Sequence, residues 1–454
     1  MTLPWPDLYI APRECAECSL VLSTPTTGAG NSRKIIAAGC VCALAFGAVC
    51  ILSHRLSPLP IWLFFGAYGL AAMAYVWLFL VMPKTLSRAE FRLVVVGAIL
   101  FRAIGFVGAP IYENDYFRYL WDGRTFAVTG SPYGRTPAAS FGDDTLPAPF
   151  PEILSQINYP DIPTIYGPVT ELSFLLAYYV SPGALWPLKL LYIAADLATL
   201  WLLAKLMPFS RNLLLYAWSP LLIKEVAFTA HPDVLAAACM VAAALALHSG
   251  RNISSGLALA AGVCARLSAG LLAPPFLRKS SKTVWAIAVL AASALYVPFL
   301  LRGAGDRGGL SAFLSEWEFN SFGYGLLAAV VGSSAAKVAC GVLFLSFYSW
   351  AWWRRPDLLR PDIVLGIFFL LAPVVNPWYL VLLVPFVALR PSASGIAATL
   401  SVLLSYATGL NLRHSGLGMF DHPGWVRPLE IAPVLLGLAY DLSRKALSGL
   451  SRAV

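Results

Sequence analysis

The sequence predicts an all-α polytopic membrane protein with about 11–14 transmembrane helices. Of its 454 residues, 59% are hydrophobic and only 12% are charged, about half the charged fraction of a typical soluble domain. Apolar runs of roughly 17–25 residues, long enough to cross a bilayer, recur along the chain. One long polar stretch, 111–165, interrupts them and predicts an external loop with short amphipathic helices.

The apolar runs divide the chain in order. Residues 1–34 are a polar tail without the layout of a cleavable signal peptide, so we expect a cytoplasmic N-terminal tail. Residues 35–110 hold three spans, 111–165 form the external loop, 166–446 hold the remaining spans with short external loops, and 447–454 form a cytoplasmic C-terminal tail. The later runs fall near 186–206, 212–230, 233–248, 282–301, 322–352, 394–411 and 429–446.

Two further regions are predicted to be pairs of short helices separated by polar residues. Residues 253–277 divide near Arg266, and residues 362–389 divide at Asn376 and Pro377. A proline-broken helix survives at membrane depth only where protein or a water-filled cavity satisfies the freed backbone groups. The two breaks therefore indicate a cavity.

The positions of lysine and arginine predict the orientation. Basic residues gather before the first span, between the second and third, and in later short loops. Placing these clusters in the cytoplasm requires about fourteen spans with both termini inside. The loop 111–165 and the segments 231–233 and 376–379 then face outward. The net charge of +9 reflects this topology, with attraction to membrane lipid secondary, and indicates no nucleic-acid partner.

The external loop carries the residues best suited to chemistry. If the loop is helical there, Asp115, Arg118, Tyr119 and Asp122 share one face. Aromatic rings stack on sugars, a carboxylate can accept a hydroxyl proton, and arginine can bind phosphate through two hydrogen bonds. The same residues also fit a solvated helix with an internal salt bridge. Glu113 and Asp115 could together hold a divalent cation, although two ligands alone are weak evidence.

The external loop also resembles the first-external-loop signature of the GT-C superfamily, which consists of membrane glycosyltransferases that use polyprenyl-phosphate sugars. The residues that carry the resemblance are Glu113-Asn114-Asp115, Arg118-Tyr119-Leu120-Trp121-Asp122-Gly123 and Gly130-Ser131-Pro132-Tyr133. Later motifs are similar to recurrent motifs of bacterial polyprenyl-phosphate-mannose-dependent α-mannosyltransferases: Tyr166-Gly167-Pro168, His231-Pro232-Asp233 and Asn376-Pro377-Trp378-Tyr379. The His-Pro-Asp element departs from the commoner Gly-His-Asn-Asp form.

The resemblance implies an inverting transfer of a hexose, mannose in this group. The donor is a polyprenyl-phosphate sugar, the acceptor is a glycan or a lipid-linked molecule, and the site faces outward from the cytoplasmic (inner) membrane. We expect Asp115, or Glu113 as second choice, to be the general base, and Arg118 and Arg266 to stabilise the leaving phosphate. The other expected substrate-binding residues are Tyr119, Trp121, Asp122, Tyr133, Tyr166, His231, Asp233, Asn376, Trp378 and Tyr379.

Several polar residues in apolar surroundings have two interpretations. Lys224 and Glu225 are either a mutual salt bridge or functional residues, and Asp233 either caps a helix or contacts substrate. Arg266 either binds phosphate or extends its side chain along the bilayer so that its charge reaches the membrane–water interface. The role of Asp196 is open, because it lies within a span without an obvious partner.

No metal site is predicted from the sequence. Cys15 and Cys18 form a lone CxxC without a second pair of ligands nearby. The late external loop contains two histidines and a carboxylate, but their spacing matches no compact site: His414, Asp421 and His422. We therefore interpret that loop as ordinary solvated chain.

The alternative function is a transporter or flippase of a lipid-linked intermediate, which would share many spans, broken helices and intramembrane charges. Two features favour the transferase: the sequence shows no internal repeat, and its polar residues concentrate in one external loop. A membrane acyltransferase or phosphotransferase would also use external carboxylates, but it would not explain the aromatic residues beside them.

Overall fold

A computed structural model describes residues 28–278, 280–301, 309, 311, 317–413 and 416–450, with side chains from residue 30 to residue 444. The described chain is helical and contains no strand, as predicted. Five of its helices are long and apolar enough to cross a membrane: Gly30–Ser53, Ile61–Val81, Trp186–Leu206, Lys282–Leu300 and Ser333–Arg354. Six shorter apolar helical stretches accompany them: Asp233–His248, Asn252–Ala265, Leu267–Leu277, Pro361–Leu371, Pro377–Leu389 and Ala393–Tyr406. The chain is a polytopic membrane protein.

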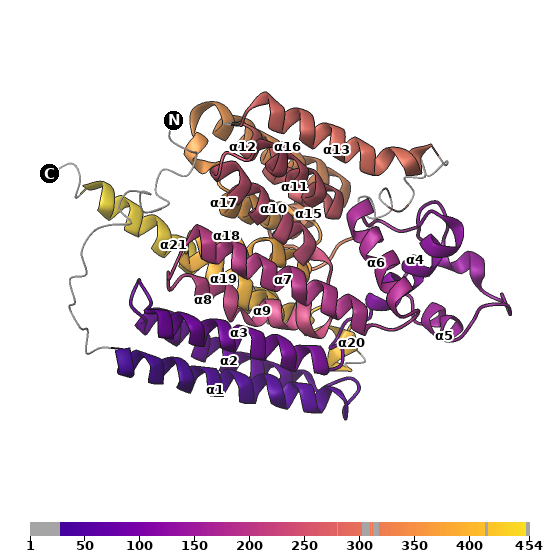
Figure 1. The fold of residues 1–454 in the computed structure, drawn as a ribbon, viewed down its shortest axis with the longest axis horizontal. Coiled ribbons are helices and arrows are strands. Elements are labelled where there is room, and N and C mark those ends of the chain that lie inside the picture. Colours follow the sequence, from indigo (N-terminus) through magenta and orange to yellow (C-terminus); the bar gives the residue numbers. More distant parts are fainter. Residues whose placement is uncertain are drawn as a thin grey trace.

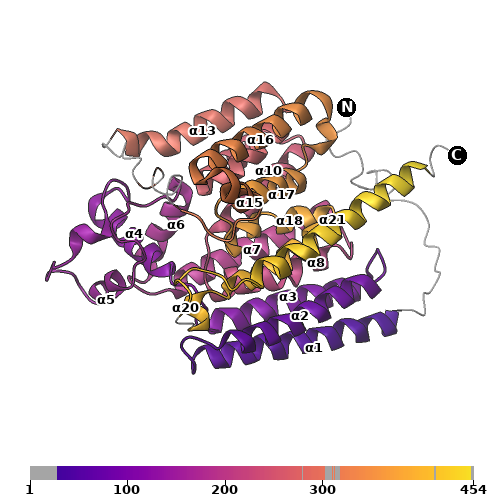
Figure 2. The ribbon, with the colours of Figure 1, turned by 180° about the vertical axis from the view of Figure 1, so that it is seen from behind.

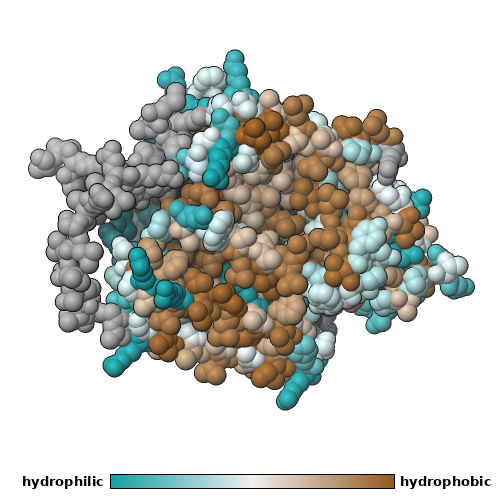
Figure 3. Space-filling view, viewed as in Figure 1, coloured by the Kyte–Doolittle hydropathy of each residue, from teal (hydrophilic) through white to brown (hydrophobic). Residues whose placement is uncertain are grey.

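The long helices lie side by side along the longest axis of the molecule (Figures 1 and 2). The helices α1 (Gly28–Ser53), α2 (Ile61–Val81) and α3 (Arg88–Val107) form one group, in which α1 packs against both others. A second group consists of α7 (Trp186–Leu206), α10 (Asp233–His248), α11 (Asn252–Ala265) and α13 (Lys282–Leu300), each packed against the next. The surface over both groups is mostly apolar, whereas polar residues gather toward the two ends (Figure 3). This distribution fits a bilayer around the bundle.

The polar stretch forms a separate layer at one end of the bundle, on the right of Figure 1. This layer, the loop layer below, contains α4 (Tyr116–Thr129) and the short helix α5 (Phe150–Ser155) of the polar stretch, together with α6 (Pro168–Val180), which follows it; α4 packs against both of the others. Close backbone contacts hold its helices together. A Cβ on Gly123 would stand 2.5 Å from the Phe174 carbonyl oxygen. Only glycine allows α4 and α6 to approach so closely.

Both predicted helix breaks are present. The helix α11 ends before Arg266, and the chain continues as a 3-10 turn η3 (Leu267–Leu272) and α12 (Ala273–Leu277). The helix α17 (Pro361–Leu371) ends before an extended segment, after which η5 (Pro377–Leu382) and α18 (Val384–Leu389) follow. Prolines at the first turns of α12, η5 and α18 account for the short lengths, because proline suits a helix start but not its interior.

Three runs that the sequence presents as long enough to span are divided. Residues 212–230 form α8 (Leu213–Ala217), α9 (Pro220–Leu222) and a π-helical turn, η2 (Ile223–Phe228). Residues 322–352 divide at Gly332, whose φ of +82° ends α15 (Gly323–Val331) before α16 (Ser333–Arg354). The third run, 394–411, divides into α19 (Ala393–Ser401), η6 (Val402–Tyr406) and α20 (Gly409–Leu412). Apolar length alone does not reveal such breaks.

The terminal helices extend beyond the predicted boundaries. The helix α1 begins at Gly28, inside the stretch expected to be a tail, and α21 (Val426–Leu450) continues past residue 446. Cys15, Cys18, His414, most of the expected N-terminal tail and half of the expected C-terminal tail lie outside the described residues. The total number of membrane crossings stays a prediction.

Asp196 has a partner that the sequence does not reveal. The Arg102 guanidinium of α3 meets it through Nε, 2.6 Å from Oδ2, and both side chains are fully buried. The Tyr216 hydroxyl donates to the other carboxylate oxygen at 2.6 Å, and Arg102 Nη1 donates to the Ala217 carbonyl at 2.6 Å. The contact therefore joins α3, α7 and α8 inside the bundle.

Removing one member of this pair should destabilise the fold strongly. Arg102→Met leaves the Asp196 carboxylate buried without its counter-charge, which costs about 3–5 kcal/mol. We expect a lower midpoint of thermal unfolding in detergent, and partial recovery when Asp196→Asn is added. The control is Arg355→Met, which breaks an exposed pair with Asp357 (side chains 52% and 60% exposed) and should change the midpoint little. Equal effects of the two single substitutions would contradict the assignment.

Candidate active site

The carboxylates Glu113 and Asp115 lie where the chain passes from α3 to α4. Tyr112 turns the backbone there with a φ of +62°, and its hydroxyl donates to the Leu59 carbonyl at 2.8 Å. Asp115 is the N-cap residue of α4, so the predicted helix begins immediately after it. Both carboxylate side chains keep part of their surface accessible although protein surrounds them. They can therefore meet a ligand.

The surroundings make both groups better bases than ordinary carboxylates. Burial raises the pKa of Glu113 well above its usual value, and the neighbouring Asp115 carboxylate raises it further, whereas the Lys224 ammonium opposes the shift. Burial also raises the pKa of Asp115, against a hydrogen bond with Asn158 and the charge of Arg118. A raised pKa brings a carboxylate closer to the range in which general bases work.

Arg118 serves mainly to hold the loop layer together. Its Nε lies 2.8 Å and 2.9 Å from the two oxygens of Asp122, one turn further along α4, and its Nη1 donates to the Ile162 carbonyl at 2.9 Å. This is the internal salt bridge that the solvated-helix interpretation of the loop anticipates. Of the three guanidinium nitrogens of Arg118, Nη2 alone has no hydrogen-bond partner among the described residues. Nη2 is therefore the nitrogen left for a ligand.

A second cation stands at the helix break after α11. Arg266 Nη1 lies 2.5 Å from Asp233 Oδ1, and its guanidinium carbon lies 4.0 Å from the centre of the Tyr379 ring. The Arg266 side chain keeps 19% of its surface exposed. The Tyr379 amide donates to the Asn376 carbonyl at 3.0 Å. Asp233 is the first residue of α10, and its carboxylate oxygens accept no hydrogen bond from the backbone, so ion pairing rather than helix capping describes its role here.

Aromatic and histidine side chains join the loop layer to the two helix breaks. The Tyr119 hydroxyl lies 3.1 Å from His231 Nδ1, and the Tyr119 ring stacks on Phe174 with centroids 4.8 Å apart. The imidazole of His231 stacks in turn on Trp378, with centroids 4.3 Å apart and an interplanar angle of 7°. The contacts bring α4, the start of α10 and η5 together.

Tyr166 is close to both charged halves of this region. Burial raises the pKa of its hydroxyl, the charge of Asp115 raises it further, and Arg266 opposes the shift. Its ring meets Tyr119 edge-on with centroids 5.4 Å apart. The charges of Asp115 in the loop and of Arg266 in the bundle therefore both act on the hydroxyl of one tyrosine.

Three further predicted substrate-binding residues make contacts in this part of the structure. Trp121 is buried against Phe150, and Asp122 is paired with Arg118 as described above. The Tyr133 hydroxyl donates to the Tyr166 carbonyl at 3.0 Å. Each side chain therefore has a structural contact, and its part in substrate binding stays a prediction.

The structure adds members that the sequence does not assign. Lys224 and Glu225 form the mutual salt bridge, 3.2 Å long, and both are fully buried. Tyr406, which is far away in the chain, donates from its hydroxyl to Glu225 Oε1 at 2.9 Å. The sequence feature that could have predicted the role of Lys224 and Glu225 is two adjacent charges in an apolar run, just before His231. No sequence feature near Tyr406 predicts its contact with Glu225.

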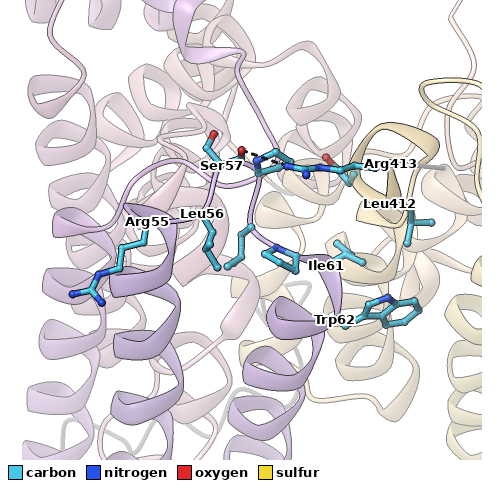
Figure 4. A pocket seen from close by; sticks show the side chains of 11 residues that line it. Arg55, Leu56, Ser57, Ile61, Trp62, Leu412 and Arg413 are labelled. Carbon is cyan, nitrogen blue, oxygen red and sulfur yellow. Dashed lines mark hydrogen bonds between the residues drawn. The ribbon is translucent and has the colours of Figure 1, made fainter. Parts of the chain in front are cut away.

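A pocket of about 430 Å³ lies next to this region, between the α1–α2 connection and α20 (Figure 4). The Arg413 guanidinium lies across it and donates to the Ser57 carbonyl at 3.5 Å, whereas the Arg55 side chain points away from Arg413. Leu59, which lines the pocket, accepts the hydrogen bond from the Tyr112 hydroxyl. The pocket is thus separated from Glu113 by Tyr112, and the two arginines do not converge on one ligand.

Among the residues that the structure describes, no group of three or more histidine, cysteine, aspartate or glutamate side chains could hold a metal ion. In the late loop, His422 lies 3.0 Å from the Ser405 carbonyl and packs on Phe319. It therefore has a structural environment of its own.

Comparison with known proteins gives one match. The model of a family described as alpha-(1->6)-mannopyranosyltransferase, N-terminal domain, matches residues 34–280, more than half of the chain. The matched part contains the loop carboxylates, Lys224, Glu225 and Arg266. No curated protein and no solved structure matches the chain.

Proposed function

The chain belongs to the alpha-(1->6)-mannopyranosyltransferase family, and from that premise we propose that it transfers mannose from a polyprenyl phosphate to a glycan or lipid-linked acceptor, forming an α-(1→6) bond with inversion. The observation that carries the proposal is that two kinds of charged group act on Tyr166, with opposite effects on the pKa of its hydroxyl. Carboxylates with raised pKa values stand on the loop side, and the partly exposed Arg266 guanidinium stands on the bundle side. Sugar transfer from a phosphate needs both a base and a cation.

The proposed step is a single displacement at the sugar C1 atom. The acceptor hydroxyl oxygen forms a bond to C1 while its proton passes to Asp115. The bond between C1 and the phosphate oxygen breaks, and polyprenyl phosphate leaves with the electron pair. Because attack and departure take place on opposite faces of C1, the configuration inverts. No general acid is required, since a phosphate is already a good leaving group.

Arg266 is the proposed partner of the leaving phosphate. Its ion pair with Asp233 and its stacking on Tyr379 hold the guanidinium in one orientation, so little reorganisation is needed when charge develops on the phosphate. Arg118 can contribute only Nη2, because its other nitrogens are engaged with Asp122 and Ile162. Arg118 is therefore a secondary phosphate contact that also keeps α4 in place.

The proposed location is the outer face of the cytoplasmic membrane. Lys84 lies in the connection between α2 and α3, and Arg88 is the first residue of α3, at the end of these helices away from the Tyr112 turn. Lysine and arginine favour the cytoplasmic side. The loop layer with Glu113 and Asp115 is then outside, where a lipid-linked donor can bring its sugar while its chain stays in the bilayer.

Purified protein incubated with radiolabelled polyprenyl-phosphate mannose should release polyprenyl phosphate only when a glycan acceptor is present, because transfer couples the two events. The label should appear in the acceptor through an α-(1→6) bond, measured by chromatography and linkage analysis. Movement of intact donor across a vesicle bilayer, without cleavage of the sugar–phosphate bond, would support a transporter instead and overturn the proposal.

Asp115→Asn should lower kcat by at least about 100-fold, because a well-placed general base contributes roughly 10²–10⁴-fold. The amide keeps the size of the side chain and cannot take up the proton, so donor binding should stay within a few-fold of wild type. Asp144→Asn, on the exposed part of the loop, is the matched control and should leave turnover unchanged. If Glu113→Gln abolishes turnover and Asp115→Asn does not, Glu113 is the base.

The pH dependence follows from the raised pKa of Asp115. The base acts only when deprotonated, so kcat/KM should fall with unit slope as pH decreases through a pKa above the ordinary value of about 3.9. Above that pKa the rate should level off. The measurement is the pH profile from about pH 4 to pH 8. A profile that is flat down to pH 4 would argue against a base with a raised pKa.

A further inference from the structure

The turn between α5 and α6 lies along the start of α4, next to the proposed base. The Asn158 side-chain amide donates to Asn114 Oδ1, and Asn114 is the residue between the two loop carboxylates. The Asn114 side-chain amide donates in turn to the Gln156 carbonyl at 3.2 Å. Further along, the Ile162 carbonyl accepts from Arg118 at 2.9 Å. The turn is therefore attached to the catalytic segment at both of its ends.

Tyr159 lies at the centre of this turn in a strained backbone conformation. Its φ is +53°, which is uncommon for a bulky side chain and persists only where the surroundings impose it. The Ile162 amide donates to the Tyr159 carbonyl at 3.1 Å, and the Ala138 amide donates to the Pro160 carbonyl at 2.9 Å. The Tyr159 side chain is nevertheless 45% exposed. The turn thus holds an accessible aromatic ring in one place.

A second aromatic ring reaches Tyr159 from a distant part of the chain. The Trp317 ring lies against it, with centroids 4.7 Å apart and an interplanar angle of 40°, and Trp317 is also partly exposed. Two residues later the chain is anchored: the Phe319 amide donates to the Pro373 carbonyl at 3.0 Å, and the Val375 amide donates to the Phe319 carbonyl at 2.9 Å. The ring pair therefore connects the loop layer to the break before η5.

Polar side chains stand beside these rings. Gln156, Asn158 and Asp161 are exposed on the same short turn. A sugar ring has an apolar C–H face and an edge of hydroxyl groups; an aromatic ring can cover the face, while amide and carboxylate groups bind the hydroxyls. Binding sites for small molecules commonly combine aromatic walls with a few such polar groups. The chemistry of the turn matches a sugar.

We propose that Tyr159 and Trp317 form a subsite that stacks on a hexose ring of the acceptor glycan, with Asn158 and Asp161 binding its hydroxyl groups. The inference rests on the proposed function and names the place of the acceptor in it. Because Asn158 is hydrogen-bonded to Asn114, a sugar on this platform lies beside the proposed base. The donor phosphate belongs to Arg266, so the two substrates occupy different parts of the site.

Anchoring at the membrane–water interface is the other ordinary use of exposed tyrosine and tryptophan. An anchor of this kind needs an apolar body and a polar tip at the level of the lipid head groups. It requires neither a strained turn nor a hydrogen bond to the residue between Glu113 and Asp115. The position of the pair on the loop layer, beside those carboxylates, favours the acceptor.

Tyr159→Ala and Trp317→Ala should each raise the KM for acceptor about tenfold, because each removes an aromatic surface from the sugar. The value of kcat at saturating acceptor and the KM for donor should stay within a few-fold of wild type. Tyr159→Phe keeps the ring and should behave like wild type. The measurement is the initial rate with polyprenyl-phosphate mannose as donor and α-(1→6)-linked mannotriose as acceptor.

The matched controls remove exposed aromatic rings elsewhere. Tyr179→Ala acts on α6 (side chain 68% exposed), and Trp353→Ala acts on the last turn of α16 (78% exposed); both should leave the KM for acceptor unchanged. A fall in kcat with an unchanged KM for acceptor in the Tyr159 and Trp317 variants would show that the pair only joins the loop layer to the bundle. A rise confined to the KM for donor would assign the pair to the lipid-linked substrate. Either result would overturn the subsite.

A second readout does not depend on turnover. Mannotriose binding to Asp115→Asn without donor, followed by saturation-transfer NMR, should weaken about tenfold when Tyr159→Ala is added. Equal binding by the single and the double variant would refute the subsite, even if the wild type transfers mannose. Absence of acceptor-dependent mannosyl transfer by the wild type would instead refute the proposed function, so the two failures are distinguishable.

Discussion

A charge inside an apolar bundle must have a partner there, and this constraint organises the described structure. Arg102 meets Asp196, Lys224 meets Glu225, and Lys189 donates to three carbonyls at the end of α3, those of Gly105, Phe106 and Gly108. The contacts of Arg102 and Lys189 join segments that are distant in the sequence, and the consecutive pair Lys224–Glu225 reaches a distant segment through Tyr406. Losing one partner would leave the other charge desolvated, so the pairs determine which helices are neighbours.

The same constraint explains why the polar residues of the site stand at breaks rather than within regular helices. A regular helix satisfies its own backbone and presents side chains at fixed intervals, whereas a break releases backbone groups and changes side-chain direction. Glu225 lies within the π turn η2, Arg266 follows the end of α11, and Trp378 lies in the first turn of η5, just after a break. Three breaks from separate parts of the chain therefore converge on His231 and its neighbours.

The sequence predicts what depends on local pattern. The breaks at Arg266 and Asn376 are confirmed because polar residues and prolines mark them, and the family is confirmed because its motifs are short and contiguous. The span expected at 212–230 is wrong, because composition cannot distinguish a π turn from a regular one. The partner of Asp196 and the role of Tyr406 could not be predicted, since each depends on a contact across many residues that only the folded bundle creates.

The division of the proposed site between a loop layer and a membrane bundle has a mechanical consequence. The proposed base belongs to the loop, the proposed phosphate-binding cation belongs to the bundle, and their separation is set by how closely the loop layer docks. At Gly167 a Cβ would stand 2.0 Å from the Cys264 carbonyl oxygen, so the backbone beside Tyr166 lies directly against the chain that leads to Arg266. Thr170 adds a hydrogen bond to the Ala265 carbonyl at 2.9 Å. Backbone contacts of this kind leave little freedom for adjustment, and they hold the two halves at one distance before any substrate binds.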